Sequence, residues 1–152
     1  MPYLWTKKLA NKLGKIVIKS LKVKDCMAAN LLTFKLTTNV VEAMDLLLKH
    51  GISGVPVVDD EGTLVGIVSE VDLIQVVVQD SYYNEPVGIV ADFMRSNVET
   101  VRSDTDIFTL AEKFIREHRR RYPVVDDGVL VGQISRRDVL RAASEFRSKA
   151  KG

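Results

Sequence analysis

Two serine–aspartate pairs with the same spacing are the first candidates for chemistry in this sequence. Ser69 precedes Asp72 and Ser135 precedes Asp138, each pair at the end of a short apolar stretch. A serine at the start of a helix lies beside unpaired backbone N–H groups, where a phosphate can bind. An aspartate one turn further on can accept hydrogen bonds from vicinal ribose hydroxyls. The same spacing also forms a capping box, so helix capping is the alternative interpretation of both pairs.

Arginines distinguish the surroundings of the two pairs. Five of them flank the second pair in the sequence, namely Arg119, Arg120, Arg121, Arg136 and Arg137. The matching positions around the first pair carry no cation, and Glu70 places a negative charge directly after Ser69. Because guanidinium groups bind phosphate bidentately, the sequence predicts that the second pair is the better phosphate site. A solvated basic turn, or salt bridges to Asp126, Asp127 or Glu117, is the alternative for these arginines.

The two pairs belong to an internal repeat. The segment Val23–Met27 recurs as Val90–Met94, and Val55–Asp60 recurs as Tyr122–Asp127, both with a shift of 67 residues (90 − 23 and 122 − 55). The shift becomes 66 after an Asp/Gly turn, where a hairpin loop can lose a residue without a change in strand register. We therefore expect an N-terminal basic amphipathic extension (1–21), a first repeat (22–79), a linker (80–88), a second repeat (89–146) and a C-terminal tail (147–152).

Each repeat predicts the same order of elements. A short strand (31–34; 98–101) leads to an amphipathic helix, for which Asn39 and Asp106 are the expected N-caps and Gly51 the stop of the first helix. A β-hairpin follows (55–58 with 64–68; 124–125 with 129–134), and a second helix begins at Ser69 or Ser135. Neither copy alone could bury both its sheet and its helices, so we expect one shared core. The predicted class is α/β (α+β), with two β-α-β-β-α repeats packed about a pseudo-two-fold axis.

Composition excludes several classes of protein. Of 152 residues, 46% are hydrophobic and 28% are charged, as in a globular protein, and the net charge of +2 means that nucleic-acid binding would need local basic clusters. The single cysteine, Cys26, rules out an intramolecular disulfide and a Cys-rich zinc site. No metal-ligand cluster, nucleophile with a base, or Gly-rich phosphate loop is present in the sequence, so we expect no enzyme. With no apolar run of about 20 residues and no secretory signal, we expect a cytoplasmic protein.

The N-terminal extension combines apolar residues at helical spacing with lysines between them. Leu9, Leu13, Ile16 and Val17 share one helical face. We expect a terminal helix that packs on its own module or on a second subunit, and binding to an anionic membrane is the alternative. The C-terminal tail is expected to be a frayed helix end.

The motifs, taken together, resemble a known family. The order Asp-x-Met, helix, h-P-V-V-D, turn, G-h-h-S-x-x-D (h, hydrophobic) occurs twice between about 22 and 146, and it resembles a tandem pair of CBS domains, named after cystathionine beta-synthase. The resemblance implies a disc-like pair with two clefts, which often forms a homodimer. It also implies that the serine contacts phosphate, that the aspartate holds the ribose, and that Arg120 and Arg121 reach the phosphate.

The adenine ring would then lie against apolar edges of the hairpins. Tyr122 and Ile134 are the candidates in the second repeat, and Val55 and Ile67 in the first. The alternative is that these four are ordinary core residues. The first cleft, which lacks the arginines, would take a ligand of little negative charge, such as adenosine or S-adenosylmethionine, or would be empty.

These expectations define a regulatory binding module without a catalytic cofactor or metal. Its ligand would be AMP, ADP, ATP or S-adenosylmethionine, and it would signal in trans to an effector protein. Two alternatives remain: a ligand-free scaffold for dimerisation, and nucleic-acid binding through the basic clusters. The sequence leaves open which adenine compound binds and whether one or both clefts are used.

Overall fold

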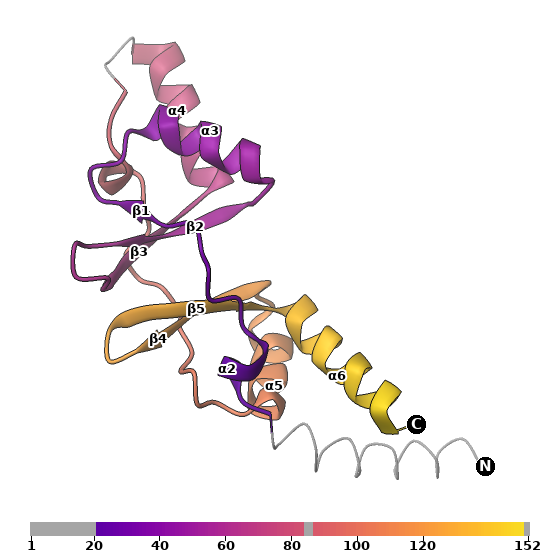
Figure 1. Cartoon of the computed structure of the whole chain (residues 1–152). Coiled ribbons are helices and arrows are strands. Elements are labelled where there is room, and N and C mark those ends of the chain that lie inside the picture. The colour runs from indigo at the N-terminus through magenta and orange to yellow at the C-terminus, as the bar shows by residue number, and fades with distance from the viewer. Residues whose placement is uncertain (1–20, 84–86, 151–152) are drawn as a thin grey trace. The chain divides into compact units, whose positions relative to one another are not determined.

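A computed structural model describes residues 21–83 and 87–150 of the chain (Figure 1). The expectations for the N-terminal extension therefore lie outside the described residues, apart from Leu21. The elements are, in order, α2 (Val23–Cys26), β1 (Phe34–Lys35), α3 (Val40–His50), β2 (Gly54–Val58), β3 (Leu64–Ser69), α4 (Glu70–Tyr83), the 3₁₀ helix η1 (Val90–Asp92), α5 (Ile107–Glu117), β4 (Arg121–Asp126), β5 (Val129–Ser135) and α6 (Arg136–Ala150). Their mixed order confirms the predicted α/β class.

The described chain forms two compact units. The α3–α4 unit contains residues 31–83, 87–99 and 127–130, and the α5–α6 unit contains residues 21–30, 100–126 and 131–150. Each unit therefore combines residues from both sequence repeats. The last turn of α4 includes the first residues of the expected linker.

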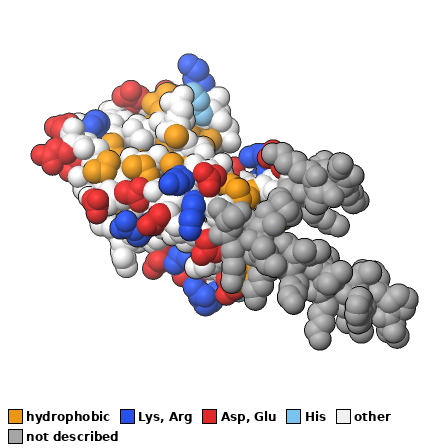
Figure 2. All heavy atoms as spheres, turned by 60° about the horizontal axis from the view of Figure 1, so that its bottom comes forward, with side chains coloured by type: hydrophobic (Ala, Val, Ile, Leu, Met, Phe, Trp, Pro, Cys, Tyr) orange, Lys and Arg blue, Asp and Glu red, His pale blue; other side chains and the backbone are white. Residues whose placement is uncertain are grey.

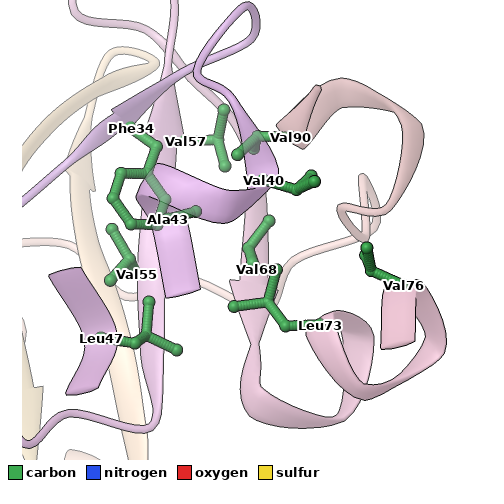
Figure 3. Close-up of a cluster of buried hydrophobic side chains, with 10 residues drawn as sticks. All are labelled: Phe34, Val40, Ala43, Leu47, Val55, Val57, Val68, Leu73, Val76 and Val90. Atoms are coloured by element: carbon green, nitrogen blue, oxygen red, sulfur yellow. The ribbon is translucent and has the colours of Figure 1, made fainter. Parts of the chain in front are cut away.

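A three-stranded sheet is the base of the α3–α4 unit. β1 pairs with β2 in parallel, and β2 pairs with β3 as an antiparallel hairpin in which Pro56 lies opposite Ile67. Figure 1 shows α3 and α4 together on one face of this sheet. Figure 3 shows the side chains between them, which are all buried: Phe34, Val40, Ala43, Leu47, Val55, Val57, Val68, Leu73, Val76 and Val90. Burial of this apolar cluster is the main force that fixes the start of α4 on the sheet.

The α5–α6 unit is built around the β4–β5 hairpin, with α2, α5 and α6 on one side of it (Figure 1). The predicted strand at 98–101 is reduced to a single parallel bridge between Val101 and Val124. The buried cluster contains Val23, Val101, Ile107, Leu110, Phe114, Tyr122, Val124 and Ile134. The rings of Phe114 and Tyr122 pack with their centroids 4.8 Å apart.

Helix ends follow local chemistry. The Asn39 side chain accepts a hydrogen bond from the backbone N–H of Val41, and the Asp106 side chain accepts one from Thr109, which confirms both predicted N-caps. The Asn39 bond goes to the second residue of α3, Val41, and not to Glu42 at the capping-box position. Gly51 ends α3 with φ +62°, the left-handed conformation that favours glycine.

The Asp-x-Met segments explain why the units mix the two repeats. Met27, from the first repeat, packs against Gly132 of β5, and Met94, from the second, packs against Gly66 of β3. A Cβ atom at either glycine would lie 2.6 Å from the methionine Sδ and 2.8 Å from a backbone carbonyl oxygen. The glycine therefore leaves the space in which the segment of the other repeat lies against the strand.

Candidate functional site

The second Ser-x-x-Asp pair lies where β5 ends and α6 begins. The Ser135 N–H and hydroxyl both donate to Asp138 Oδ2, at 2.8 and 3.0 Å, and the Asp138 N–H donates to Ser135 Oγ at 3.2 Å. This reciprocal arrangement is a capping box, as the capping interpretation of the pair expects. The other carboxylate oxygen, Asp138 Oδ1, accepts a bond of 3.0 Å from Arg141 Nη1 on the same helix.

The first pair has the same hydrogen bonds at the start of α4. The Ser69 N–H and hydroxyl donate to Asp72 Oδ2 at 2.8 and 2.9 Å, and the N–H of Asp72 lies 3.4 Å from Ser69 Oγ. Asp72 is 3% exposed and is the buried charged residue of the described core. Its Oδ1 accepts a bond of 3.3 Å from Nε of Arg95.

Sequence reasoning missed Arg95. The positions of the first repeat that match the arginine cluster carry no cation, but Arg95, from another segment, lies beside Asp72. Arg95 follows the Asp-x-Met segment of the second repeat, and only the fold brings it to Asp72 of the first. The repeat could have pointed to Arg95 only if it were already known that each Asp-x-Met segment lies against the strand of the other repeat. The sequence does not show this.

The arginine cluster lies at the start of β4 and of α6. The Arg136 N–H donates to the Arg120 carbonyl at 3.0 Å, which holds the start of β4 beside the N-terminus of α6. Within residues 21–83 and 87–150, the exposed side chains of Arg119, Arg120, Arg136 and Arg137 form no ion pair. Arg121 is half-buried.

Two of the three carboxylates proposed as salt-bridge partners for this cluster, Glu117 and Asp126, have other partners. Glu117 accepts bonds from Lys113 Nζ at 2.8 Å and from the Tyr122 hydroxyl at 2.6 Å, and these bonds lower the pKa of its carboxyl group. Asp126 accepts bonds from the hydroxyl and N–H of Ser103, which lower the pKa of its carboxyl group. Both carboxylates are therefore stabilised in the charged form without help from the arginine cluster.

The four adenine-pocket candidates lie in or beside the cores. Val55, Tyr122 and Ile134 are fully buried, and Ile67 is half-buried. Val55 belongs to the buried cluster of the α3–α4 unit and Tyr122 and Ile134 to that of the α5–α6 unit, whereas Ile67 belongs to neither cluster. Contact between adenine and the edges of these side chains stays a prediction.

Two further features of the described residues concern metal ligation and thiol chemistry. Among them, no group of three or more His, Cys, Asp or Glu side chains is arranged to hold a metal ion. Burial, followed by the nearby charge of Asp25, raises the pKa of the Cys26 thiol, which disfavours the reactive thiolate.

Charge is intermixed on the face of the molecule that Figure 2 draws. Figure 2 shows basic and acidic side chains interspersed on the face turned to the viewer, in agreement with the net charge of +2. Within the described part of the chain, no helix has the length and hydropathy needed to cross a membrane.

Comparison with known proteins identifies the family that this fold and these motifs define. The model of the CBS domain matches residues 23–79 and 90–145. The chain therefore belongs to the CBS domain family, as a protein with two such domains.

Individual relatives support this assignment. The chain is 30% identical to the chloroplastic CBS domain-containing protein CBSX2 of Arabidopsis thaliana, over 78% of this chain and 60% of that protein. It is 32% identical to the A-adding tRNA nucleotidyltransferase of Aquifex aeolicus, over 85% of this chain but 15% of that enzyme. The chain thus spans less than two thirds of the length of these curated relatives.

Solved structures agree with the fold. The crystal structure of CBSX2 in complex with AMP matches with a TM-score of 0.73 and 36% identity, over 83% of this chain and 98% of the other. The CBS domain pair of protein MJ0100, in complex with 5′-methylthioadenosine and S-adenosyl-L-methionine, matches with a TM-score of 0.67 and 28% identity, over 83% and 98% of the two chains.

Proposed function

We propose that this protein is a non-catalytic regulatory module that binds an adenine nucleotide or adenosyl compound at the Ser135–Asp138 pair. The observation that carries the proposal is the meeting of a helix N-terminus, an aspartate one turn inside it and exposed arginines without ion-pair partners among the described residues. Each feature suits one part of a nucleotide: backbone N–H groups and guanidinium groups suit the phosphate, and the carboxylate suits the ribose.

The capping box is compatible with this role. A ligand phosphate can replace the Ser135 hydroxyl at the helix N-terminus, and among the described residues Asp138 Oδ1 is bonded to an exposed arginine three residues further along α6. Exposed pairs of this kind contribute little, typically about 0.2–1 kcal/mol, so the ribose hydroxyls can compete for this oxygen. The complexes of CBSX2 with AMP and of MJ0100 with two adenosyl compounds support the ligand class.

Calorimetric titration of the full chain with AMP, ADP, ATP and S-adenosylmethionine tests the proposal. We expect at least one of them to bind, and the binding to be lost in Asp138→Ala. A ligand at a hundredfold excess over its dissociation constant should add about 2.7 kcal/mol to the free energy of unfolding. The matched control is Asp104→Ala, which removes an exposed carboxylate of the same unit that pairs with Arg102. No binding of any adenine compound, or equal binding by Asp138→Ala, would rule the site out.

The contribution of the arginines is separable from that of the aspartate. If Arg120 and Arg137 contact phosphate, their replacement by alanine weakens AMP binding and leaves adenosine binding nearly unchanged. If they are only a solvated basic turn, both ligands bind the double variant as they bind the wild type.

The scaffold hypothesis is the second candidate, because the capping boxes are complete without a ligand. It predicts no thermal shift with any adenine compound, together with self-association of the ligand-free protein. Nucleic-acid binding would instead appear as an affinity that falls steeply with salt. Formation of a homodimer and signalling to an effector protein in trans are further parts of the proposal, tested by sedimentation and by the response of a candidate partner to ligand.

A further inference from the structure

Arg95 distinguishes the environments of the two aspartates. Asp72 Oδ1 accepts a bond from Arg95, which comes from a segment 23 residues further along the chain. Asp138 Oδ1 accepts a bond from Arg141 of its own helix. The side chain of Asp72 is 5% exposed and that of Asp138 is 16% exposed, so the first carboxylate is the more enclosed.

The backbone fixes Arg95 beside β3. The N–H and carbonyl of Arg95 exchange hydrogen bonds of 2.9 Å with Ile67, two residues before Ser69. From this anchor the arginine side chain, itself 64% exposed, reaches back to Asp72. Ser69 engages Oδ2 and Arg95 engages Oδ1, so both carboxylate oxygens have partners.

The second pair lacks an equivalent of this contact. The repeat shift of 67 places Ala28 at the position of Arg95 (95 − 67 = 28), and Ala28 forms the same pair of backbone bonds, with Gln133. A methyl group cannot pair with a carboxylate. Conversely, the shift of 66 places Gln75 where the second repeat has Arg141 (141 − 66 = 75). Arg95 and Arg141 therefore occupy non-equivalent positions in the two repeats and do not form one shared motif.

We propose that Arg95 is a specificity-determining residue that masks Asp72 and restricts nucleotide binding to the Asp138 site. This inference rests on the proposed function. A ribose hydroxyl that binds Asp72 must displace a charge-assisted hydrogen bond from an enclosed carboxylate, and a neutral hydroxyl is the weaker donor. At Asp138 the ribose competes with Arg141, whose hydrogen bond is also charge-assisted. The Asp138 side chain is 16% exposed against 5% for Asp72, however, so water screens the pair at Asp138 more strongly. The full chain therefore binds one nucleotide, although its sequence carries two Ser-x-x-Asp pairs.

Calorimetric titration with AMP in an Asp138→Ala background tests this directly, because the background removes the second site. We expect the single variant to bind AMP at least about tenfold more weakly than the wild type. Because the first pair has no arginine cluster for a phosphate, adenosine is titrated beside AMP. The double variant Asp138→Ala/Arg95→Ala should regain binding of one adenosine per chain, and further replacement Asp72→Ala should abolish it. Arg95→Gln in the same background, which keeps part of the side-chain length without the charge, is a second variant in which Asp72 should become available to the ligand. Arg141→Ala in the wild-type chain is the matched control and should leave one bound AMP per chain.

Thermal unfolding establishes that each variant is folded. If the wild type binds one AMP and neither Arg95 variant binds better than Asp138→Ala alone, the masking role is overturned and the proposed function stands. Binding of two AMP molecules by the wild type overturns it as well. Absence of AMP binding in the wild type and in every variant removes the proposed function, and the masking role with it.

Discussion

At the scale of single residues, Gly66 and Gly132 are the positions where the structure most clearly requires glycine. Each lies in the middle of a strand, which a glycine ordinarily weakens, yet each faces a methionine sulfur and a backbone carbonyl at distances that exclude a Cβ atom. A backbone carbonyl cannot swing away as a flexible side chain can. The strain of a larger residue would therefore spread into the strand and the Asp-x-Met segment.

We expect Gly66→Ala and Gly132→Ala each to destabilise the protein by about 1–3 kcal/mol, as overpacking of a filled site does. Thermal and urea unfolding followed by circular dichroism measure the change. Gly54→Ala is the matched control, because its Cβ would lie 3.5 Å from the nearest atom, the Val68 carbonyl oxygen. If all three variants unfold alike, the close approach at Gly66 and Gly132 has no energetic consequence.

At the scale of elements, α3 and α5 end in the same conformation with different residues. Gly51 ends α3 with φ +62°, and His118, at the matching position 67 residues later, ends α5 with φ +55°. The left-handed conformation costs a residue with a Cβ atom about 1–2 kcal/mol, whereas glycine adopts it freely. The α5 end therefore carries local strain that the α3 end does not.

Replacement His118→Gly should raise the free energy of unfolding by about 0.5–1 kcal/mol, because it removes this strain at some cost in unfolded-state entropy. Gly51→Ala should lower it by about 1 kcal/mol, and no atom lies within 4 Å of the added Cβ to confound the result. Equilibrium urea unfolding measures both. A stability loss in His118→Gly would mean that the imidazole side chain stabilises the protein by more than the backbone strain destabilises it.

At the scale of the whole molecule, the two compact units do not coincide with the two repeats. Residues 21–30 lie with the α5–α6 unit, and residues 87–99 lie with the α3–α4 unit. Met27 and Met94 are the side chains that these segments place against Gly132 and Gly66. Each repeat therefore supports a strand of the other.

Amide hydrogen exchange on the full chain can test whether each Asp-x-Met segment packs on a strand of the other repeat. Met27→Ala should speed amide exchange at 131–135 in β5, and Met94→Ala should speed it at 64–69 in β3, because each removes packing from the strand it contacts. The two variants serve as controls for each other. The assignment fails if Met27→Ala affects β3 and leaves β5 unchanged.

Local sequence patterns predicted most of the secondary structure. The N-caps Asn39 and Asp106, the stop at Gly51 and both hairpins were predictable because each depends on residues a few positions apart. The hairpin turns show this directly: Asp127 and Gly128 both have positive φ, as a two-residue turn requires, so the shorter second loop keeps its strands paired. The strand at 98–101 was overestimated, because a four-residue segment rich in β-branched side chains does not reveal how many partners its backbone will find.

The sequence by itself determined the two repeats, most of their elements, the family and the Ser-x-x-Asp pairs, since all of these depend on local composition and spacing. Only the tertiary structure decided which Asp-x-Met segment lies on which strand, and hence that Arg95 of the second repeat meets Asp72 of the first. The physical reason is that packing between segments far apart in sequence depends on which faces must be buried together, and the spacing of residues within one repeat does not encode that choice.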